Sequence, residues 1–225
     1  MPATPKQLLA SWDASKQQAY RQHHHAQAPT FHILLDASPS MAGDDARNLR
    51  QAYNTYLAWL QRHTDPMSMA DVRCFSTALD PGQLCPLGQL RPLTTTTYDP
   101  LRGDGTALYR AIGETCVTAP REGQHILIVF TDGNDNTSDT FGWTYTKVGE
   151  LLKTLQAEQS WLCLFLGAFP DALHVARVMG FHPRNCLVFT TDKIPEAFQT
   201  LRHATQRYLG TAPHERKRLA AGGLF

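Results

Sequence analysis

The chain lacks the features that direct a protein into a membrane or hold it together by disulfides. No apolar run approaches the roughly 20 residues of a membrane-spanning helix, and residues 1–10 contain no apolar core of signal-peptide length. The five cysteines are an odd number and include no C-x-x-C spacing, which argues against a cysteine-based zinc site. We therefore expect reduced cysteines, no contact with membranes and a cytoplasmic location.

An excess of charge of either sign is also missing. Lys and Arg together number 21 and Asp and Glu number 20, so the net charge is +1 and gives no reason to expect nucleic acid as a partner. The content of 42% hydrophobic and 18% charged residues is that of an ordinary globular protein. A chain of 225 residues is long enough for one well-buried α/β domain.

Several familiar catalytic motifs are absent. The sequence contains no G-x-S-x-G elbow, no G-x-x-x-x-G-K-[ST] phosphate loop and no G-x-G-x-x-G after its first apolar run. The histidines are scattered and provide no Ser/His/Asp arrangement. These absences disfavour α/β-hydrolase chemistry and nucleotide binding, and we expect that the protein is not an enzyme.

Short apolar runs alternate with amphipathic segments along the chain. The predicted strands are Phe31–Asp36, Ala70–Ser76, a polar pair within Gln83–Leu93, His125–Asp132, Trp161–Ala168 and Cys186–Thr190. The predicted helices are Asp44–His63, Thr106–Val117, Tyr145–Ala157, Leu173–Met179 and Pro195–Leu209, each with apolar residues at helical spacing. This alternation predicts an α/β fold: a doubly wound, mainly parallel six-stranded sheet with one antiparallel edge strand and helices on both faces.

The two ends of the chain differ in composition from this core. Residues 1–28 are predicted as a helical extension that ends in a polar run containing His23–His25, and residues 29–209 as the domain. Residues 210–225, which include Gly222 and Gly223, are predicted as a flexible tail. Three adjacent histidines can bind a transition metal, but a solvated segment is the simpler interpretation.

The first strand ends in a loop rich in oxygen atoms. Asp36 closes the apolar run, and Ser38 and Ser40 follow it at alternate positions. Open α/β sheets bind ligands beyond the carboxyl ends of their strands. Carboxylate and hydroxyl oxygens suit Mg²⁺, Mn²⁺ or Ca²⁺ better than zinc.

Two further loops are predicted to lie beside this one. Thr106 follows Gly105 where a helix begins, and Asp132 ends the second long apolar strand in the sequence Thr131-Asp132-Gly133. If these two strands are neighbours in the sheet, Asp36 and Asp132 project from adjacent carboxyl ends and Thr106 approaches from the intervening loop.

These residues carry a resemblance. Asp36-x-Ser38-x-Ser40, Gly105-Thr106 and Thr131-Asp132-Gly133 resemble the three-part metal-ion-dependent adhesion site of the von Willebrand factor type A domain, whose fold is Rossmann-like. The resemblance covers residues 29–209. A free-standing, unsecreted domain of this type resembles small bacterial or phage-borne relatives that act as adaptors in multi-protein stress-response or defence systems.

The resemblance implies a role for each residue. Ser38 and Ser40 bind the metal through their hydroxyls, Thr106 adds a third hydroxyl in the ligand-binding state, and Asp36 and Asp132 act mostly through bound waters. A first shell of neutral hydroxyls leaves the cation, Mg²⁺ or alternatively Mn²⁺ or Ca²⁺, only partly neutralised. Such a cation can accept a Glu or Asp carboxylate from a protein partner.

Other interpretations of the same residues stay open at this point. Asp36, Ser38 and Ser40 also fit a helix-capping cluster after a strand. Metal-bound carboxylates at strand ends can serve a Mg²⁺-dependent phosphoryl-transfer or hydrolytic enzyme, although Ser38 stands where aspartyl phosphatases carry a second Asp. In a third interpretation the site is structural, and the amino-terminal helix or the tail contacts the partner.

Some positions depart from the pattern. Pro39 stands where the family often has Gly, so one backbone N–H is lost. Asp104 is either a further carboxylate near the metal or the cap of the following helix. Asp135, Asn136 and Asp139 are interpreted as a solvated turn.

Overall fold

The computed structural model describes residues 28–158 and 160–225. The predicted amino-terminal extension, with His23–His25, lies outside the described residues apart from residue 28. No helix among the described residues is long and apolar enough to cross a membrane.

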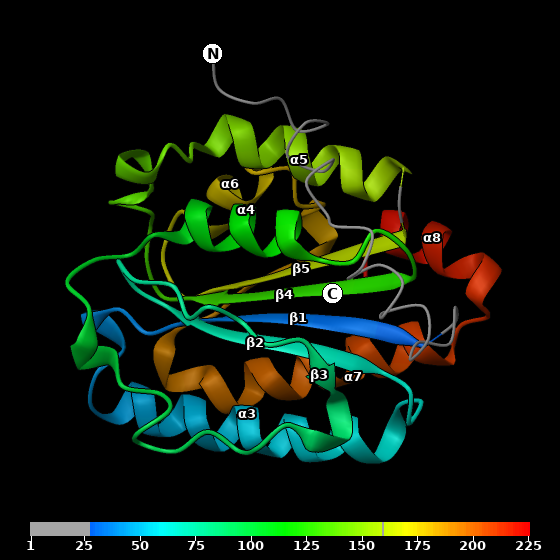
Figure 1. The fold of residues 1–225 in the computed structure, drawn as a ribbon, viewed down its shortest axis with the longest axis horizontal. Helices are drawn as coiled ribbons and strands as arrows, with labels where there is room; N and C mark the ends of the chain where they lie inside the picture. Colours follow the sequence, from blue (N-terminus) through cyan, green and yellow to red (C-terminus); the bar gives the residue numbers. More distant parts are fainter. Residues whose placement is uncertain (1–27, 159) are drawn as a thin grey trace.

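A six-stranded sheet forms the centre of the molecule (Figure 1). Its order is β3-β2-β1-β4-β5-β6, and every neighbouring pair is parallel except β2 and β3. The strands are β1 (Pro29–Asp36), β2 (Met69–Phe75), β3 (Cys85–Pro86), β4 (Gln124–Thr131), β5 (Ser160–Gly167) and β6 (Cys186–Val188). The predicted doubly wound, mainly parallel sheet with one antiparallel edge is confirmed.

Helices cover both faces of the sheet. Figure 1 shows α3 (Asp44–His63) and α7 (Ile194–Gly210) on one face, and α4 (Leu108–Thr118), α5 (Tyr145–Glu158) and α6 (Ala172–Val178) on the other. All eight residues of β1 and all eight of β4 are buried, as expected for central parallel strands enclosed on both sides. The continuous apolar runs of the sequence are therefore explained by burial on two faces.

The apolar stripes of the helices point at the sheet. In α3, Leu49, Tyr53, Tyr56 and Leu60 are at most 2% exposed, and their spacing places them on one side of the helix. The Tyr56 hydroxyl lies 2.8 Å from the hydroxyl of Thr205 in α7, which satisfies two polar groups inside this layer. The predicted helical periodicity therefore corresponds to the buried faces.

The carboxyl-terminal residues differ from the predicted flexible tail. Residues Pro213–Gly222 form a helix, α8, and Leu224 is only 6% exposed. The backbone N–H of Leu224 donates to the side-chain oxygen of Asn185 at 3.0 Å, and the Asn185 amide donates to the carbonyl of Ala220 at 2.9 Å. Burial of an apolar side chain and these hydrogen bonds hold the end of the chain against the domain.

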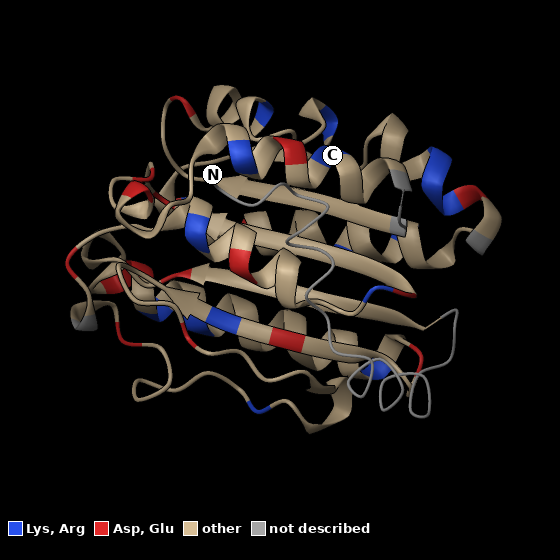
Figure 2. Cartoon of the chain, turned by 45° about the horizontal axis from the view of Figure 1, so that its top comes forward, with Lys and Arg blue, Asp and Glu red and all other residues tan. Residues whose placement is uncertain are grey.

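Charged residues of both signs are spread over the helices and loops. Figure 2 shows several Asp and Glu residues in the loops at one end of the sheet. Asp36 and Asp132, which terminate or directly follow central strands, belong to this end. The fold thus brings carboxylates together at the carboxyl ends of the strands.

Candidate functional site

The candidate site lies where the sheet changes its direction of growth. From β1 the chain first adds β2 on one side, and later adds β4 on the other side of β1. Both neighbours are parallel to β1, so the carboxyl ends of β1 and β4 are adjacent. The condition set by the sequence, that these two strands are neighbours, is met, and the loops after them flank the crevice in which such sheets bind ligands.

Four of the five predicted residues are linked by hydrogen bonds. The N–H of Ser38 donates to Asp36 Oδ1 at 2.8 Å, and the two hydroxyls of Ser38 and Ser40 lie 3.0 Å apart. The Ser40 hydroxyl donates to Asp132 Oδ1 at 2.9 Å. The chain of contacts therefore crosses from the loop after β1 to the loop after β4.

Thr106 approaches the same place from the segment before α4. Its side chain is 5% exposed, and its hydroxyl would be 4.0 Å from a Cβ atom placed on Gly133. Its backbone N–H donates to the side-chain oxygen of Asn136 at 2.8 Å, and its carbonyl accepts from the Asn136 N–H at 3.0 Å. Thr106 is thus held beside the Asp132-Gly133 loop by backbone contacts rather than by a bond to the other four residues.

Pro39 fits the local conformation of the first loop. It is the first residue of a 3-10 turn, η1 (Pro39–Met41), in which the N–H of Met41 donates to the carbonyl of Ser38. At this position a backbone N–H has no partner within the turn, and the fixed φ of proline matches the turn. The loss of the N–H therefore costs no hydrogen bond within the turn.

Gly105 is required by the close approach of the second and third loops. A Cβ atom at this position would lie 2.8 Å from both Asn136 Oδ1 and Thr137 Cγ2. A larger residue would push away the side chain that holds the Thr106 backbone. The glycine before Thr106 therefore has a packing reason that is independent of any bound ion.

The two carboxylates have unusual electrostatics. Burial raises the pKa of Asp36 to about 6, against the hydrogen bonds from Ser38 and Thr131, and the charge of Asp132 raises it further. Burial also raises the pKa of Asp132, although the Ser40 hydrogen bond lowers it. Neither carboxylate forms an ion pair with a Lys, Arg or His among the described residues. A cation bound between them would supply the missing charge.

The donor set is suited to a hard cation. Among the described residues there is no group of three or more His, Cys, Asp or Glu side chains placed to hold a metal ion. The candidate site has two carboxylates and three hydroxyls, so all its donors are oxygen atoms. Such a set fits Mg²⁺, Mn²⁺ or Ca²⁺ and does not fit metals that prefer nitrogen or sulfur.

Sequence reasoning missed three residues that position the site. The Thr131 hydroxyl donates to Asp36 Oδ2 at 2.5 Å, and the Tyr98 hydroxyl donates to the Asp36 carbonyl. Asn136, interpreted as part of a solvated turn, instead anchors Thr106. Thr131 could have been suspected from its place before Asp132, whereas nothing local in the sequence marks Tyr98, which is 62 residues away from its partner.

Two acidic residues have other partners than expected. Asp104 accepts a hydrogen bond from the Thr77 hydroxyl, and the residue before α4 is Ala107, so Asp104 is not the helix cap. Asp135 accepts from the backbone N–H of Tyr109 at 2.8 Å and from that of Ser138 at 3.0 Å. Asp135 therefore joins the first turn of α4 to the loop after β4.

Comparisons of the sequence with protein families and with curated proteins gave no match. Comparison with solved structures did. The pilus adhesin SpaC from Lactobacillus rhamnosus GG matches with a TM-score of 0.63 and 11% identity, over 82% of this chain and 31% of that one. Proximal thread matrix protein 1 from the mussel byssus matches with a TM-score of 0.54 and 16% identity, over 80% and 48%.

The ArnB paralog VWA2 from Sulfolobus acidocaldarius also matches, with a TM-score of 0.54 and 16% identity, over 79% of this chain and 45% of that one. The chain has a von Willebrand factor type A fold. At these identities the likeness concerns the type A fold alone. The chain spans half or less of the length of these three solved structures.

Proposed function

We propose that the protein is a metal-dependent protein-binding module. A divalent cation, Mg²⁺ or alternatively Mn²⁺ or Ca²⁺, is held by Ser38, Ser40 and Thr106, with Asp36 and Asp132 behind them. The cation binds a Glu or Asp carboxylate of a protein partner. The observation that carries this proposal is the hydrogen-bonded chain from Asp36 to Asp132, whose carboxylates have no ion-pair partner among the described residues.

The exposure of the site residues supports an intermolecular role. Asp36 is fully buried and Ser38 is 2% exposed, whereas Ser40 is exposed and Asp132 is partly exposed. The buried members can fix the geometry, and the outer members leave a side of the cation open to another molecule. Neutral hydroxyls do not cancel the charge of the ion, which therefore keeps its attraction for an external carboxylate.

The hydrogen bonding of Asp36 favours binding over catalysis. An aspartyl nucleophile must reach its substrate, but Asp36 is fully buried, and its Oδ1 accepts from the Ser38 N–H and its Oδ2 from the Thr131 hydroxyl. Both oxygens are thus occupied in positioning the loops. This arrangement supports the binding proposal over a Mg²⁺-dependent phosphoryl-transfer or hydrolytic enzyme.

Calorimetric titration with Mg²⁺ and Mn²⁺ tests the metal site. We expect wild type to bind and Ser38→Ala and Asp132→Ala to bind about 10- to 100-fold more weakly, since each change removes a ligand or the group that orients one. Ser68→Ala is the matched control, because Ser68 is buried, its hydroxyl has no hydrogen-bond partner among the described residues, and it precedes β2 at the other end of the sheet. Absence of binding by wild type would remove the metal-dependent mechanism.

A metal-dependent pull-down from the native cell tests partner binding. Captured proteins should be lost with a chelator and with Asp132→Ala, and retained with Ser68→Ala. A component of a stress-response or defence complex among them would support the adaptor role, which rests on the resemblance of the motifs. Phosphatase or hydrolase turnover by metal-loaded wild type, abolished in both site variants, would instead favour the enzyme.

A further inference from the structure

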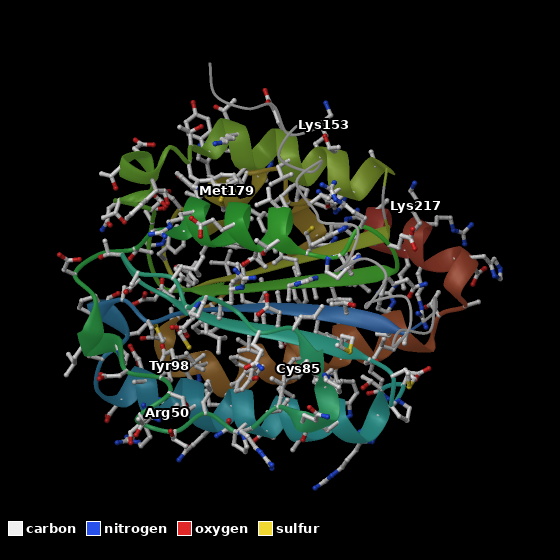
Figure 3. All side chains as sticks on the ribbon, in the orientation of Figure 1. Arg50, Cys85, Tyr98, Lys153, Met179 and Lys217 are labelled. Atoms are coloured by element: carbon white, nitrogen blue, oxygen red, sulfur yellow. The ribbon has the colours of Figure 1, made fainter. Side chains whose placement is uncertain are left out.

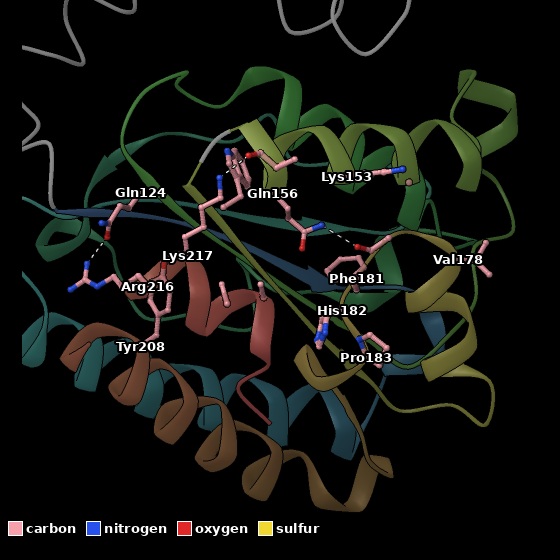
Figure 4. A pocket seen from close by; sticks show the side chains of 16 residues that line it. Gln124, Lys153, Gln156, Val178, Phe181, His182, Pro183, Tyr208, Arg216 and Lys217 are labelled. Atoms are coloured by element: carbon pink, nitrogen blue, oxygen red, sulfur yellow. Dashed lines mark hydrogen bonds between the residues drawn. The ribbon is translucent and has the colours of Figure 1, made fainter. Parts of the chain in front are cut away.

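A second concave region lies at the opposite end of the sheet from the metal loops. It is a pocket of about 670 Å³, within the range of small-molecule sites. Gln124 and Trp161, at the amino-terminal ends of β4 and β5, contribute to its lining together with residues of α5 and α8 (Figure 4). Because β4 runs from Gln124 to Thr131, the length of the strand, roughly 23 Å, separates the pocket from the candidate metal site.

The lining of the pocket is positively charged. Lys153, Arg216 and Lys217 line it, and no Asp or Glu among the described residues does so. None of these three cations forms an ion pair with a carboxylate among the described residues. Figure 3 shows Lys217 at the far end of the molecule from Tyr98, which marks the metal loops. The described residues therefore give the pocket a positive charge, at the far end of the molecule from the first site.

Two of the cations are held in place by neutral acceptors. Lys217 Nζ donates to the carbonyl of Ala157 in the last turn of α5 at 2.8 Å. Arg216 donates to the carbonyls of Leu209 and Thr211 at the end of α7 and to the side-chain oxygen of Gln124. The carboxyl end of a helix carries about half a negative charge, so these contacts orient the cations without neutralising them.

The inner wall of the pocket is apolar and well packed. Trp161, Phe181 and Tyr208 are 4%, 2% and 2% exposed, so the pocket meets aromatic groups that are fixed in the core. Figure 4 shows Arg216 and Lys217 toward one side and Lys153 toward the other, with Gln156 between Lys217 and Lys153. Val178, Pro183 and Ala221 also line the pocket over this packed floor, so a ligand can bury an apolar body there while its charge stays near a lysine at the rim.

We propose that this pocket binds a small amphipathic anion, a molecule with an aromatic or aliphatic body and one carboxylate, sulfonate or phosphate group. The amino-terminal segment of the chain is a poorer occupant, because residues 1–27 carry Lys6, Lys16 and Arg21 against the single acid Asp13. A basic segment has the same sign of charge as the pocket. Anion binding here does not depend on the metal-binding function proposed above.

The test compares two ligands of nearly equal shape and different charge. Naphthaleneacetate is the anionic probe and naphthaleneethanol is its neutral counterpart, and each is titrated into the full chain by calorimetry. We expect the anion to bind at least about fivefold more tightly, and the difference to shrink as salt is added, because one charge interaction near a surface is worth about 1 kcal/mol or more and is screened.

Variants locate the binding. Lys153 lines the pocket and makes no hydrogen bond or ion pair among the described residues. Lys153→Gln should therefore weaken the binding of naphthaleneacetate about fivefold and have little effect on the binding of naphthaleneethanol. Lys193→Gln, an exposed lysine outside the pocket, is the matched control and should change neither affinity. Ala221→Trp fills the pocket from α8 and should abolish both. Circular dichroism and thermal unfolding check that each variant is folded.

Each other outcome overturns the proposal. No binding of either probe by the folded wild type means that the pocket holds no such ligand. Equal affinity for anion and alcohol means that the cations take no part. Binding that survives Ala221→Trp places the ligand elsewhere on the molecule. The expected result for Ser38→Ala is weaker Mg²⁺ binding with unchanged anion binding, so failure of this proposal is distinguishable from failure of the metal site.

Discussion

At the scale of single residues, the site depends on groups that position other groups. Asp36 receives hydrogen bonds from three different parts of the chain, to its side chain from Ser38 and Thr131 and to its carbonyl from Tyr98. Thr106 is placed by Asn136. The site residues therefore owe part of their geometry to Thr131, Tyr98 and Asn136, which are not among the candidate metal residues.

Asn136→Ala should disturb the metal loops. The change removes the acceptor of the Thr106 N–H. We expect this loss to lower the free energy of unfolding by about 1 kcal/mol and the affinity for Mg²⁺ about tenfold. Urea unfolding and calorimetry measure the two effects. Asn134→Ala, an exposed asparagine of the same loop with no hydrogen bond in the described structure, is the control. If both variants behave alike, Asn136 has no positioning role.

His32 should make stability fall in acid. Burial, with the nearby charge of Arg73, lowers its pKa to about 3, and its ring stacks against both His125 and Trp161, which also stack on each other. The folded pKa lies below the unfolded one, near 6.5, so the unfolded chain binds the extra proton as the pH drops below 6.5. Between pH 7 and pH 5 this costs about 2 kcal/mol.

Denaturant unfolding of wild type and His32→Gln at pH 7 and pH 5 measures this contribution. The raised pKa of Asp36 acts in the opposite direction, since the folded protein then binds the extra proton. The contribution of Asp36 to the pH dependence is the same in wild type and His32→Gln, so it cancels when the two are compared. An equal loss of stability in wild type and variant would contradict the role given to His32.

At the scale of elements, most strands and helices agree with their predicted ranges. The strand from Phe31 to Asp36 and the helix from Asp44 to His63 could be located because their apolar residues recur with the period of the element. Residues Pro213–Gly222 could not, because α8 is polar and its position depends on contacts with Gln124, Ala157 and Asn185. Local periodicity contains no signal for such an element.

Leu224→Ala tests whether the end of the chain is part of the folded domain. Leu224 is 6% exposed and packs against the core on the α3 and α7 face, so its truncation should cost about 2 kcal/mol. Leu101→Ala is the control, because Leu101 is 76% exposed and should change stability by less than about 0.5 kcal/mol. Urea unfolding compares them. A flexible tail would leave both variants equal to wild type.

At the scale of the whole molecule, the two candidate sites occupy opposite ends of one sheet. The metal loops follow β1 and β4, and the cationic pocket lies where β4 and β5 begin. Strands β1 and β4 are buried along their whole length. Two separate ligands can therefore bind the molecule at the same time.

The stability effects of the two ends should add. Ser38→Ala and Leu224→Ala share no partner and lie far apart, so the double variant should lose the sum of the single losses to within about 0.5 kcal/mol. Urea unfolding of wild type, the two single variants and the double variant gives the four free energies of this double-mutant cycle. A coupling above about 1 kcal/mol would show that the metal loops and the carboxyl terminus communicate through the sheet.

Periodicity was sufficient to predict most element ranges and the strand–helix alternation of a parallel sheet, and the five candidate metal residues were predicted from the resemblance of their motifs to a known family. Such patterns are local, because the spacing of apolar residues within a short stretch of sequence shows whether one face or both faces of the element are buried. The adjacency of β1 and β4, the anchoring of Thr106 by Asn136 and of Asp36 by Tyr98, the docking of α8 and the cationic pocket all join residues that are far apart in the chain. Such contacts depend on how the elements pack, and no short segment contains the information that sets them.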